Sequence, residues 1–434
     1  MAKITGPRWC FWFLVGLSIV STQIAQPIHA SEVPSSINGI YSGTVGHHRI
    51  VLGIGRDPAR EDSENSGGSR DPKIYPIEGR YFYRRHGVDI HLVGMPLADG
   101  SFRLREYRRA PEDEFSAEWR LKIQGDRAAG VFCKCELNDK SKPAGSLLKI
   151  SLKRLSYELE DKDEDLYDEL VLAFPLKDGP EIKVSTEVAY RMRSDSRFEV
   201  RRPQLTRFPD VEVMARINRA MAHELRRDRL KASVNLSEAH FGTALGGFYN
   251  EWVGVSFFLP DILSVVVDQN WYWGGAHPNE ATYSLDYNLH TGRRFELDKA
   301  LQTATGKSTE SDIAHLLSRL YLRHYVQPSV AYKWLYEKPS GEVVEMSCKE
   351  IIRDRTSNEE EPFSATLYLS EKGLVISPIL PYTEQECGPE VTIPYPELRP
   401  FVKRNSMLQL LVEARAGNLA NQRCVDSDSS SCGP

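Results

Sequence analysis

Apolar and polar side chains alternate through most of residues 38–157. The alternating runs are short and follow one another at intervals of about ten residues, with turn-forming pairs such as Asp99-Gly100 and Gly125-Asp126 between them. Because successive side chains of a strand point to opposite faces, a two-residue period places one apolar row against a core. The segment is therefore predicted to be an antiparallel meander, closed as a small barrel or folded as a sandwich.

The periodicity becomes mixed from residue 182 onward. Apolar residues recur at helical spacing behind Asp210, a residue type that caps helices, and this predicts a long amphipathic helix. A second helix is expected over Thr309–Tyr336, kinked or split at Pro328 because proline has no backbone N–H to donate. Strand-like runs separate the two, so the fold class of this half is α+β.

A strongly acidic stretch lies between the two halves. Eight Asp and Glu residues fall between Glu158 and Glu169 without the central glycine of a calcium loop, so we expect a solvated linker or a domain-edge strand. The predicted division of the chain is a signal peptide at residues 1–30, an antiparallel β domain at 38–157, an acidic linker at 158–181, an α+β domain at 182–405, and a short helix with a cysteine-containing tail at 406–434.

The N-terminus has the pattern of an export signal. Lys3 and Arg8 precede an apolar run up to Val20, and Ala30 offers a small residue at a cleavage point. The run is shorter than the roughly 20 residues that a membrane-spanning helix needs. We expect a periplasmic or secreted protein with no stable membrane insertion after cleavage; an uncleaved anchor or a buried first helix is the alternative. With 55 Lys and Arg against 60 Asp and Glu and no basic block, nucleic acid is not an expected partner.

The cysteines beyond residue 30 are even in number, as in disulfide-bonded proteins of an oxidising compartment. Cys133 and Cys135, on either side of Lys134, are either two free thiols or ligands of a metal. No second pair of ligands completes a tetrahedral site, so neither a metal nor another cofactor is predicted. The disulfide candidates are Cys424 with Cys432 and Cys348 with Cys387.

The densest candidate for function is the segment QNWYWGGAHPN, residues 269–279. Tryptophan and tyrosine dominate binding hot spots, and glycine lets another chain approach the backbone closely. Alternatively, the two tryptophans fill a core and the glycines form a bulge. The candidate contact residues are Trp271, Tyr272, Trp273, Gly274, Gly275 and His277.

The residues around this turn resemble a known domain family. The Gly-Gly-Ala-His turn is followed, from Ser284, by Ser-Leu-Asp-Tyr-Asn-Leu-x-Thr-Gly-Arg-x-Phe-x-Leu. Together with Arg202-Pro203-Gln204-Leu205 ahead of the first helix, and with segments 371–376 and 391–398, the pattern resembles the RsiV-like extracytoplasmic domain over about residues 182–405. Cell-envelope proteins, including a lysozyme-sensing anti-sigma factor, share that domain.

The resemblance implies a non-catalytic binding module of the bacterial cell envelope, with a muramidase or a cell-wall glycan as partner. No catalytic residues are predicted, because Gly254-Val255-Ser256-Phe257-Phe258 lacks the second glycine of a nucleophile elbow. Gly53-Ile54-Gly55 likewise lacks the third glycine of a dinucleotide loop. An envelope hydrolase with an unrecognised active site, or an envelope stress sensor, remains the alternative.

Overall fold

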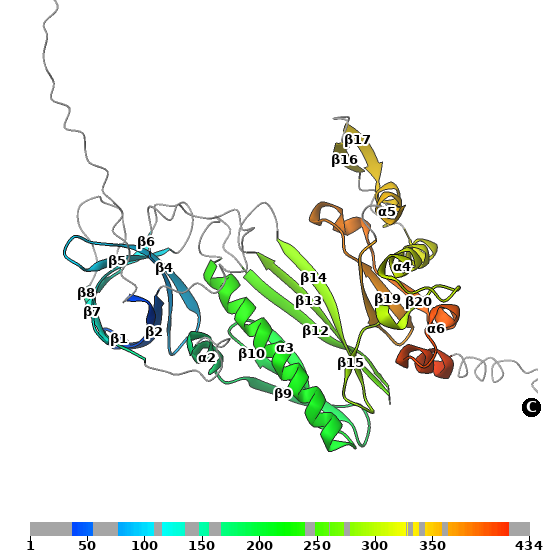
Figure 1. The fold of residues 1–434 in the computed structure, drawn as a ribbon, viewed down its shortest axis with the longest axis horizontal. Helices are drawn as coiled ribbons and strands as arrows, with labels where there is room; N and C mark the ends of the chain where they lie inside the picture. Colours follow the sequence, from blue (N-terminus) through cyan, green and yellow to red (C-terminus); the bar gives the residue numbers. More distant parts are fainter. Residues whose placement is uncertain are drawn as a thin grey trace, which may run out of the picture.

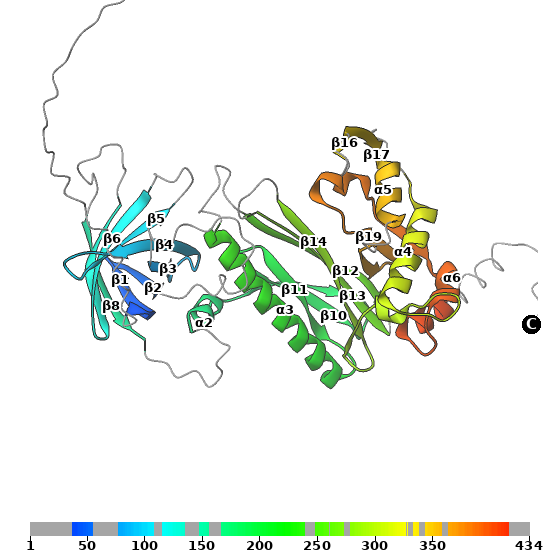
Figure 2. The ribbon, with the colours of Figure 1, turned by 45° about the horizontal axis from the view of Figure 1, so that its top comes forward.

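The structure is a computed structural model, and it describes residues 37–54, 77–107, 115–134, 147–155, 166–238, 248–259, 261–272, 278–326, 328, 333–337, 343–357 and 363–415. The predicted signal peptide, Cys135 and the Cys424–Cys432 pair lie outside these residues. Figures 1 and 2 show three parts side by side: a barrel, a central layer of strands crossed by one long helix, and a C-terminal part of strands and helices. Among the helices of the described ranges, none is long and apolar enough to cross a membrane.

Eight antiparallel strands form a closed barrel, in which each strand pairs with the next and β1 pairs with β8. The meander prediction is confirmed, and of its two forms the barrel is correct. Aromatic and aliphatic side chains fill the interior, where the carboxylate of Glu106 accepts hydrogen bonds from Tyr81 Oη (2.5 Å) and Trp119 Nε1 (2.9 Å). The strands are β1 (Gly39–Val45), β2 (His48–Ile54), β3 (Ile77–Tyr83), β4 (Asp89–Pro96), β5 (Phe102–Tyr107), β6 (Phe115–Gln124), β7 (Arg127–Cys133) and β8 (Leu147–Arg154).

The stretch expected to be a solvated linker, residues 158–181, contains structure. It includes helix α2 (Leu166–Leu172) and the start of β9 (Lys177–Lys183). The charge of the segment predicted exposure, but Tyr167 and Val171, on either side of Asp168 and Glu169, are buried against the outer wall of the barrel. The apolar surface that these side chains bury stabilises a helix that the acidic composition did not predict.

A buried carboxylate connects the barrel to the rest of the molecule. Asp89 of β4 is fully buried and accepts hydrogen bonds from Tyr167 Oη (2.7 Å) and Ser233 Oγ (2.8 Å). Arg80 lies 3.4 Å from Asp89 and 2.6 Å from Asp168. Burial raises the pKa of Asp89, although the Arg80 charge and the two hydroxyl donors act in the opposite direction. This network joins three elements that lie far apart in sequence.

The central layer is built around helix α3 (Val211–Glu238). Asp210 begins it as predicted, because its Oδ1 accepts hydrogen bonds from the backbone N–H groups of Glu212 and Val213, both at 2.9 Å. The apolar stripe of α3 packs on two sheets, ordered β11-β10-β9 and β12-β13-β14-β15. Their strands are β10 (Ala189–Asp195), β11 (Val200–Arg207), β12 (Phe248–Leu259), β13 (Ile262–Tyr272), β14 (Asn279–Asn288) and β15 (Arg294–Phe295).

The C-terminal part has its own core of helices and one three-stranded sheet. The helix predicted over Thr309–Tyr336 is wrong in length: α4 ends at His324, before Pro328, and Lys333–Glu337 is strand β16. Helix α4 begins with a capping box between Thr309 and Asp312. The elements are η2 (Asp298–Ala300), α4 (Glu310–His324), β16 (Lys333–Glu337), β17 (Val343–Ser347), α5 (Cys348–Ser357), β18 (Ala365–Leu369), β19 (Gly373–Pro378), η3 (Tyr382–Cys387), β20 (Val391–Pro394), α6 (Tyr395–Leu398), η4 (Arg399–Phe401) and a helix at 407–415.

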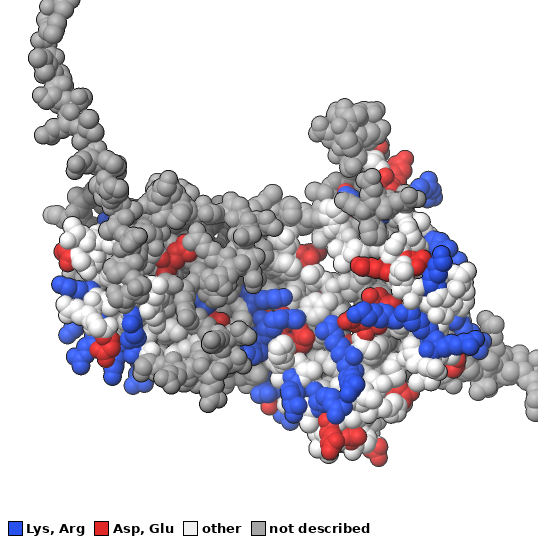
Figure 3. All heavy atoms as spheres, viewed as in Figure 1, with Lys and Arg blue, Asp and Glu red and all other residues white. Residues whose placement is uncertain are grey.

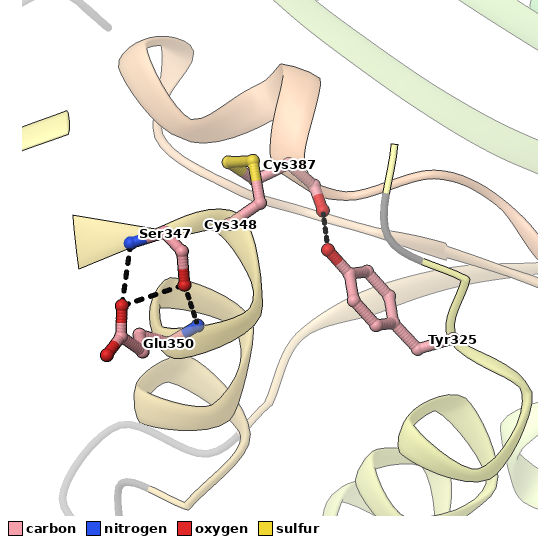
Figure 4. Close-up of a disulfide and its surroundings, with 5 residues drawn as sticks. All are labelled: Tyr325, Ser347, Cys348, Glu350 and Cys387. Carbon is pink, nitrogen blue, oxygen red and sulfur yellow. Dashed lines mark hydrogen bonds between the residues drawn. A yellow bond between two sulfur atoms is a disulfide. The ribbon is translucent and has the colours of Figure 1, made fainter. Parts of the chain in front are cut away.

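Cys348 and Cys387, one of the two candidate pairs, form a disulfide that joins the first turn of α5 to η3 (Figure 4). The hydroxyl of Tyr325 donates to the backbone carbonyl of Cys387 at 3.1 Å. Ser347 and Glu350 form reciprocal hydrogen bonds that cap α5 beside the bridge. The disulfide therefore fixes the position of a helix whose first-turn N–H groups are already capped by local hydrogen bonds.

Asp286 is expected to make stability depend on pH. Burial raises the pKa of this carboxyl to about 6 from 3.8, although hydrogen bonds from serines and the Arg294 charge act to lower it. The native state therefore holds a proton that the unfolded chain releases, so the stabilisation present below pH 3.8 is lost as the pH rises through 6. We expect Asp286→Asn to be about 3 kcal/mol more stable than the wild type at pH 7.

Urea denaturation of both proteins at several pH values measures this difference. The advantage of the asparagine variant should shrink steadily toward pH 4, where the wild-type carboxyl is protonated in the native state. The difference between the two proteins cancels the titration of all other carboxylates. An advantage that does not change with pH would show that Asp286 is not the titrating group.

Candidate functional site

The structure describes only part of the predicted Trp271–His277 contact turn. Trp271 points to the α3 side of the sheet, where it is half-buried against a cluster that joins the barrel, α2 and α3. Tyr272 points to the opposite side, is 6% exposed and stacks on Phe248. Trp273, Gly274, Gly275 and His277 lie outside the described residues, so their contact role stays a prediction.

The face of the β12–β14 strands that points away from α3 is the candidate site. Strand alternation separates it from the packed face: Val253 and Val267 are paired across β12 and β13 in the α3 core, whereas their neighbours Trp252 and Asp268 are paired on the other side. We call this surface the outer face. Its residues are Asn250, Trp252 and Gly254 of β12, Asp268 and Asn270 of β13, and Glu280, Thr282 and Ser284 of β14.

Trp252 is the dominant side chain of the outer face. It is 55% exposed and lies on β12, the edge strand of its sheet. Gly254 lies beside it without a side chain, and a Cβ at Gly254 would come within 2.5 Å of the far edge of the indole. The ring therefore lies along the strand over the glycine and presents flat apolar area to solvent.

Hydrogen-bonding groups surround this aromatic area. Thr282 Oγ1 donates to Asp268 Oδ1 at 2.7 Å, and Asn270 Nδ2 donates to Glu280 Oε1 at 2.9 Å. Burial raises the pKa of Asp268, and the charge of Glu390 raises it further, against the opposing effect of the Thr282 hydrogen bond. The face thus combines an apolar platform with carboxylates, an amide and hydroxyls.

The C-terminal sheet supplies a second wall. Thr366 of β18 donates its hydroxyl to the backbone carbonyl of Thr282 on β14, and Tyr368 Oη donates to Glu390 Oε2 at 2.6 Å. The pKa of Tyr368 is raised, first by burial, then by its bond to Glu390 and by the charges of Glu390 and Asp268. The hydrogen bond between Thr366 and Thr282 joins the two sheets at this edge of the outer face.

The opposite, packed face holds a different polar cluster. Arg202 is 1% exposed; it bridges the carboxylates of Glu251 and Asp228 and donates to Tyr283 Oη at 2.7 Å. Gln269 Nε2 also donates to Glu251, at 3.2 Å. A cavity of about 70 Å³ adjoins Arg202 and is lined by three further arginines, each paired with a carboxylate. Because the charges pair with one another and the cavity has room for only a few waters, we assign this cluster a structural role.

The prediction from sequence did not include Trp252. The signal that identifies the residue is the alternation itself: if Val253 and Val255 face the core, Trp252 and Gly254 face away. The alternation within one strand does not predict which face of the sheet the C-terminal part leaves exposed.

A search with the sequence finds no matching protein-family model and no matching curated protein. Among solved structures, the crystal structure of a DUF3298 family member from Bacteroides fragilis is similar to this chain. The two share 13% sequence identity and a TM-score of 0.32, and the similarity covers 54% of this chain and 96% of that one. At these values the likeness concerns part of the fold and assigns neither a family nor an activity to the chain.

Proposed function

We propose that this protein is a secreted or periplasmic, non-catalytic module of the bacterial cell envelope that binds glycan on the outer face of β12–β14. The observation that carries the proposal is the Trp252 indole, 55% exposed and laid flat over Gly254. Sugar rings have apolar C–H faces that stack on such a platform, and their hydroxyls need donors and acceptors at its rim. Asn250, Asp268 and Thr282 supply those groups.

Two sequence features support the envelope setting. The apolar run that ends near Val20 and the small residue Ala30 have the form of an export signal. The resemblance of residues 182–405 to the RsiV-like extracytoplasmic domain points to the same compartment and to a binding role. Between the two partners that the resemblance implies, the outer face favours the glycan, because its platform is one flat ring bordered by small polar groups.

Trp252→Ala tests the proposal. Truncating an aromatic anchor is expected to weaken binding to purified peptidoglycan at least about thirtyfold, or 2 kcal/mol. Stability should change by no more than about 0.5 kcal/mol, because the side chain is exposed. Leu147→Ala, which removes an exposed apolar side chain (64%) from barrel strand β8, is the matched control and should bind normally.

Gly254→Val provides a second variant that leaves Trp252 in place. The added side chain would occupy the position of the indole edge, so it should displace the ring and weaken binding without removing the aromatic group. Cosedimentation with peptidoglycan and binding to a purified muramidase are measured in parallel. Binding to the muramidase alone, or unchanged peptidoglycan binding by Trp252→Ala, would contradict the proposal.

A hydrolase is the second candidate, and one observation favours it. Burial and the charge of Glu390 raise the pKa of Asp268, which lies beside the platform. Glycosidases use a pair of carboxyl groups of this kind, one of them with a raised pKa. Release of reducing ends from peptidoglycan by the wild type, abolished in Asp268→Asn and in Glu390→Gln, would establish this activity in place of simple binding.

A further inference from the structure

Helix α3 carries a row of basic side chains along its solvent face. Each residue of the row lies three or four positions after the one before it, so all of them lie on one side of the helix. At a rise of about 1.5 Å per residue the row extends over about 22 Å. We call it the α3 row; it consists of Arg216, Arg219, His223, Arg227 and Lys231, all exposed.

The acids of α3 offset the positive charge of the row mainly at Arg227. Like charges three or four positions apart, such as Arg216 and Arg219, destabilise a helix. Glu224 pairs with Arg227 of the row (2.5 Å) and with Arg294 (3.6 Å), and Asp228, which is buried on Arg202, also lies 3.5 Å from Arg227. An external anion bound along this exposed face would remove the remaining repulsion between the basic side chains of the row.

The positive surface continues beyond the helix. Arg216 donates to the backbone carbonyl of Thr291, which places the start of the row beside the β14–β15 turn. Arg293 on that turn and Arg294 at the start of β15 are both exposed. In Figure 3, Lys and Arg side chains gather over the region where Figure 1 draws α3 and β15. The whole chain has a net charge of -5, so this concentration is a local property.

The side chains of the row favour a particular partner. Most are arginines, whose planar guanidinium groups form paired hydrogen bonds with phosphate oxygens. The residues between them on the exposed face include Ala215 and Ala222 rather than the bulky apolar side chains that helices insert into lipid. The row is also narrow and straight, which matches a chain better than a broad membrane surface.

We propose that a linear phosphate-bearing polymer binds along the α3 row and onto the β14–β15 turn. This site is separate from the outer face, because α3 covers the other side of the β12–β15 sheet. The bound polymer would neutralise the repulsion within the row and release its own counterions, so affinity should fall steeply with salt. Binding here does not depend on glycan recognition by Trp252.

The test compares two charge-matched double variants of the full protein. Arg219→Ala/Lys231→Ala removes two cations of the row, whereas Lys122→Ala/Lys372→Ala removes two exposed cations from the barrel and the β18–β19 turn. The probe is inorganic polyphosphate. The row variant should bind at least about tenfold more weakly, with a salt slope reduced by about 2, and the control should resemble the wild type.

Further measurements decide the nature of the partner. Circular dichroism confirms that the row variant is folded, and Arg219→Gln is the milder substitute if it is not. Phosphatidylglycerol vesicles, polygalacturonate and single-stranded DNA are titrated in parallel at equal charge. Tighter binding of any of these, absence of polyphosphate binding, or equal binding by the two double variants would overturn the proposal. Trp252→Ala should leave polyphosphate binding unchanged, which separates this site from the glycan site.

Discussion

Arg202→Met is expected to destabilise the protein by about 3–5 kcal/mol, because it leaves two buried carboxylates without their cation. Arg202 is 1% exposed and bridges Asp228, which is fully buried, and Glu251, which is 8% exposed. Methionine has a similar length and preserves most of the packing, so the loss reports mainly the unpaired charge. Urea denaturation followed by circular dichroism measures it.

The triple variant Arg202→Met/Asp228→Asn/Glu251→Gln is the matched control. It removes both carboxylate charges together with the guanidinium, and the amides can still hydrogen-bond to Tyr283 and Gln269. Replacing a whole buried ion network with neutral groups is often close to neutral in stability, so we expect the triple variant to recover most of the loss. If it is as unstable as Arg202→Met, lost packing rather than unpaired charge is the cause.

Removing the Cys348–Cys387 disulfide is expected to cost about 4 kcal/mol. The bridge closes a loop with a sequence separation of 39, and closing such a loop restricts the unfolded chain. The effect should be confined to the C-terminal part, since both cysteines belong to its core. Thermal unfolding of Cys348→Ser/Cys387→Ser, alone and with a reductant, measures the change.

Reduction of the wild type is the control for this prediction. A reductant should lower the melting temperature of the wild type toward that of the double variant and have a much smaller effect on the variant. Tyr325→Phe, which removes only the hydrogen bond to the Cys387 carbonyl, should cost about 1 kcal/mol. A large effect of reductant on the double variant would show that another cysteine pair makes the main contribution.

Local patterns in the sequence determined much of the secondary structure. The two-residue period of residues 38–157 predicted antiparallel strands, since alternation follows from the geometry of an extended backbone. Asp210 predicted the start of α3, because an N-cap acts on N–H groups only two or three residues away. Lys372-Gly373 likewise marks the turn between β18 and β19. In each case the decisive contacts lie within a few residues along the chain.

Only the tertiary structure decided what depends on distant partners. Barrel closure needs β1 to pair with β8, across more than a hundred residues of chain. Helix α2 forms at Leu166–Leu172 because Tyr167 is buried where it contacts Asp89 and Phe82, and its charged neighbours in the sequence did not predict this burial. The exposure of Trp252 depends on where the C-terminal sheet stops covering the outer face. Such outcomes are set by long-range burial and pairing, and the residues that supply those partners cannot be identified from local spacing.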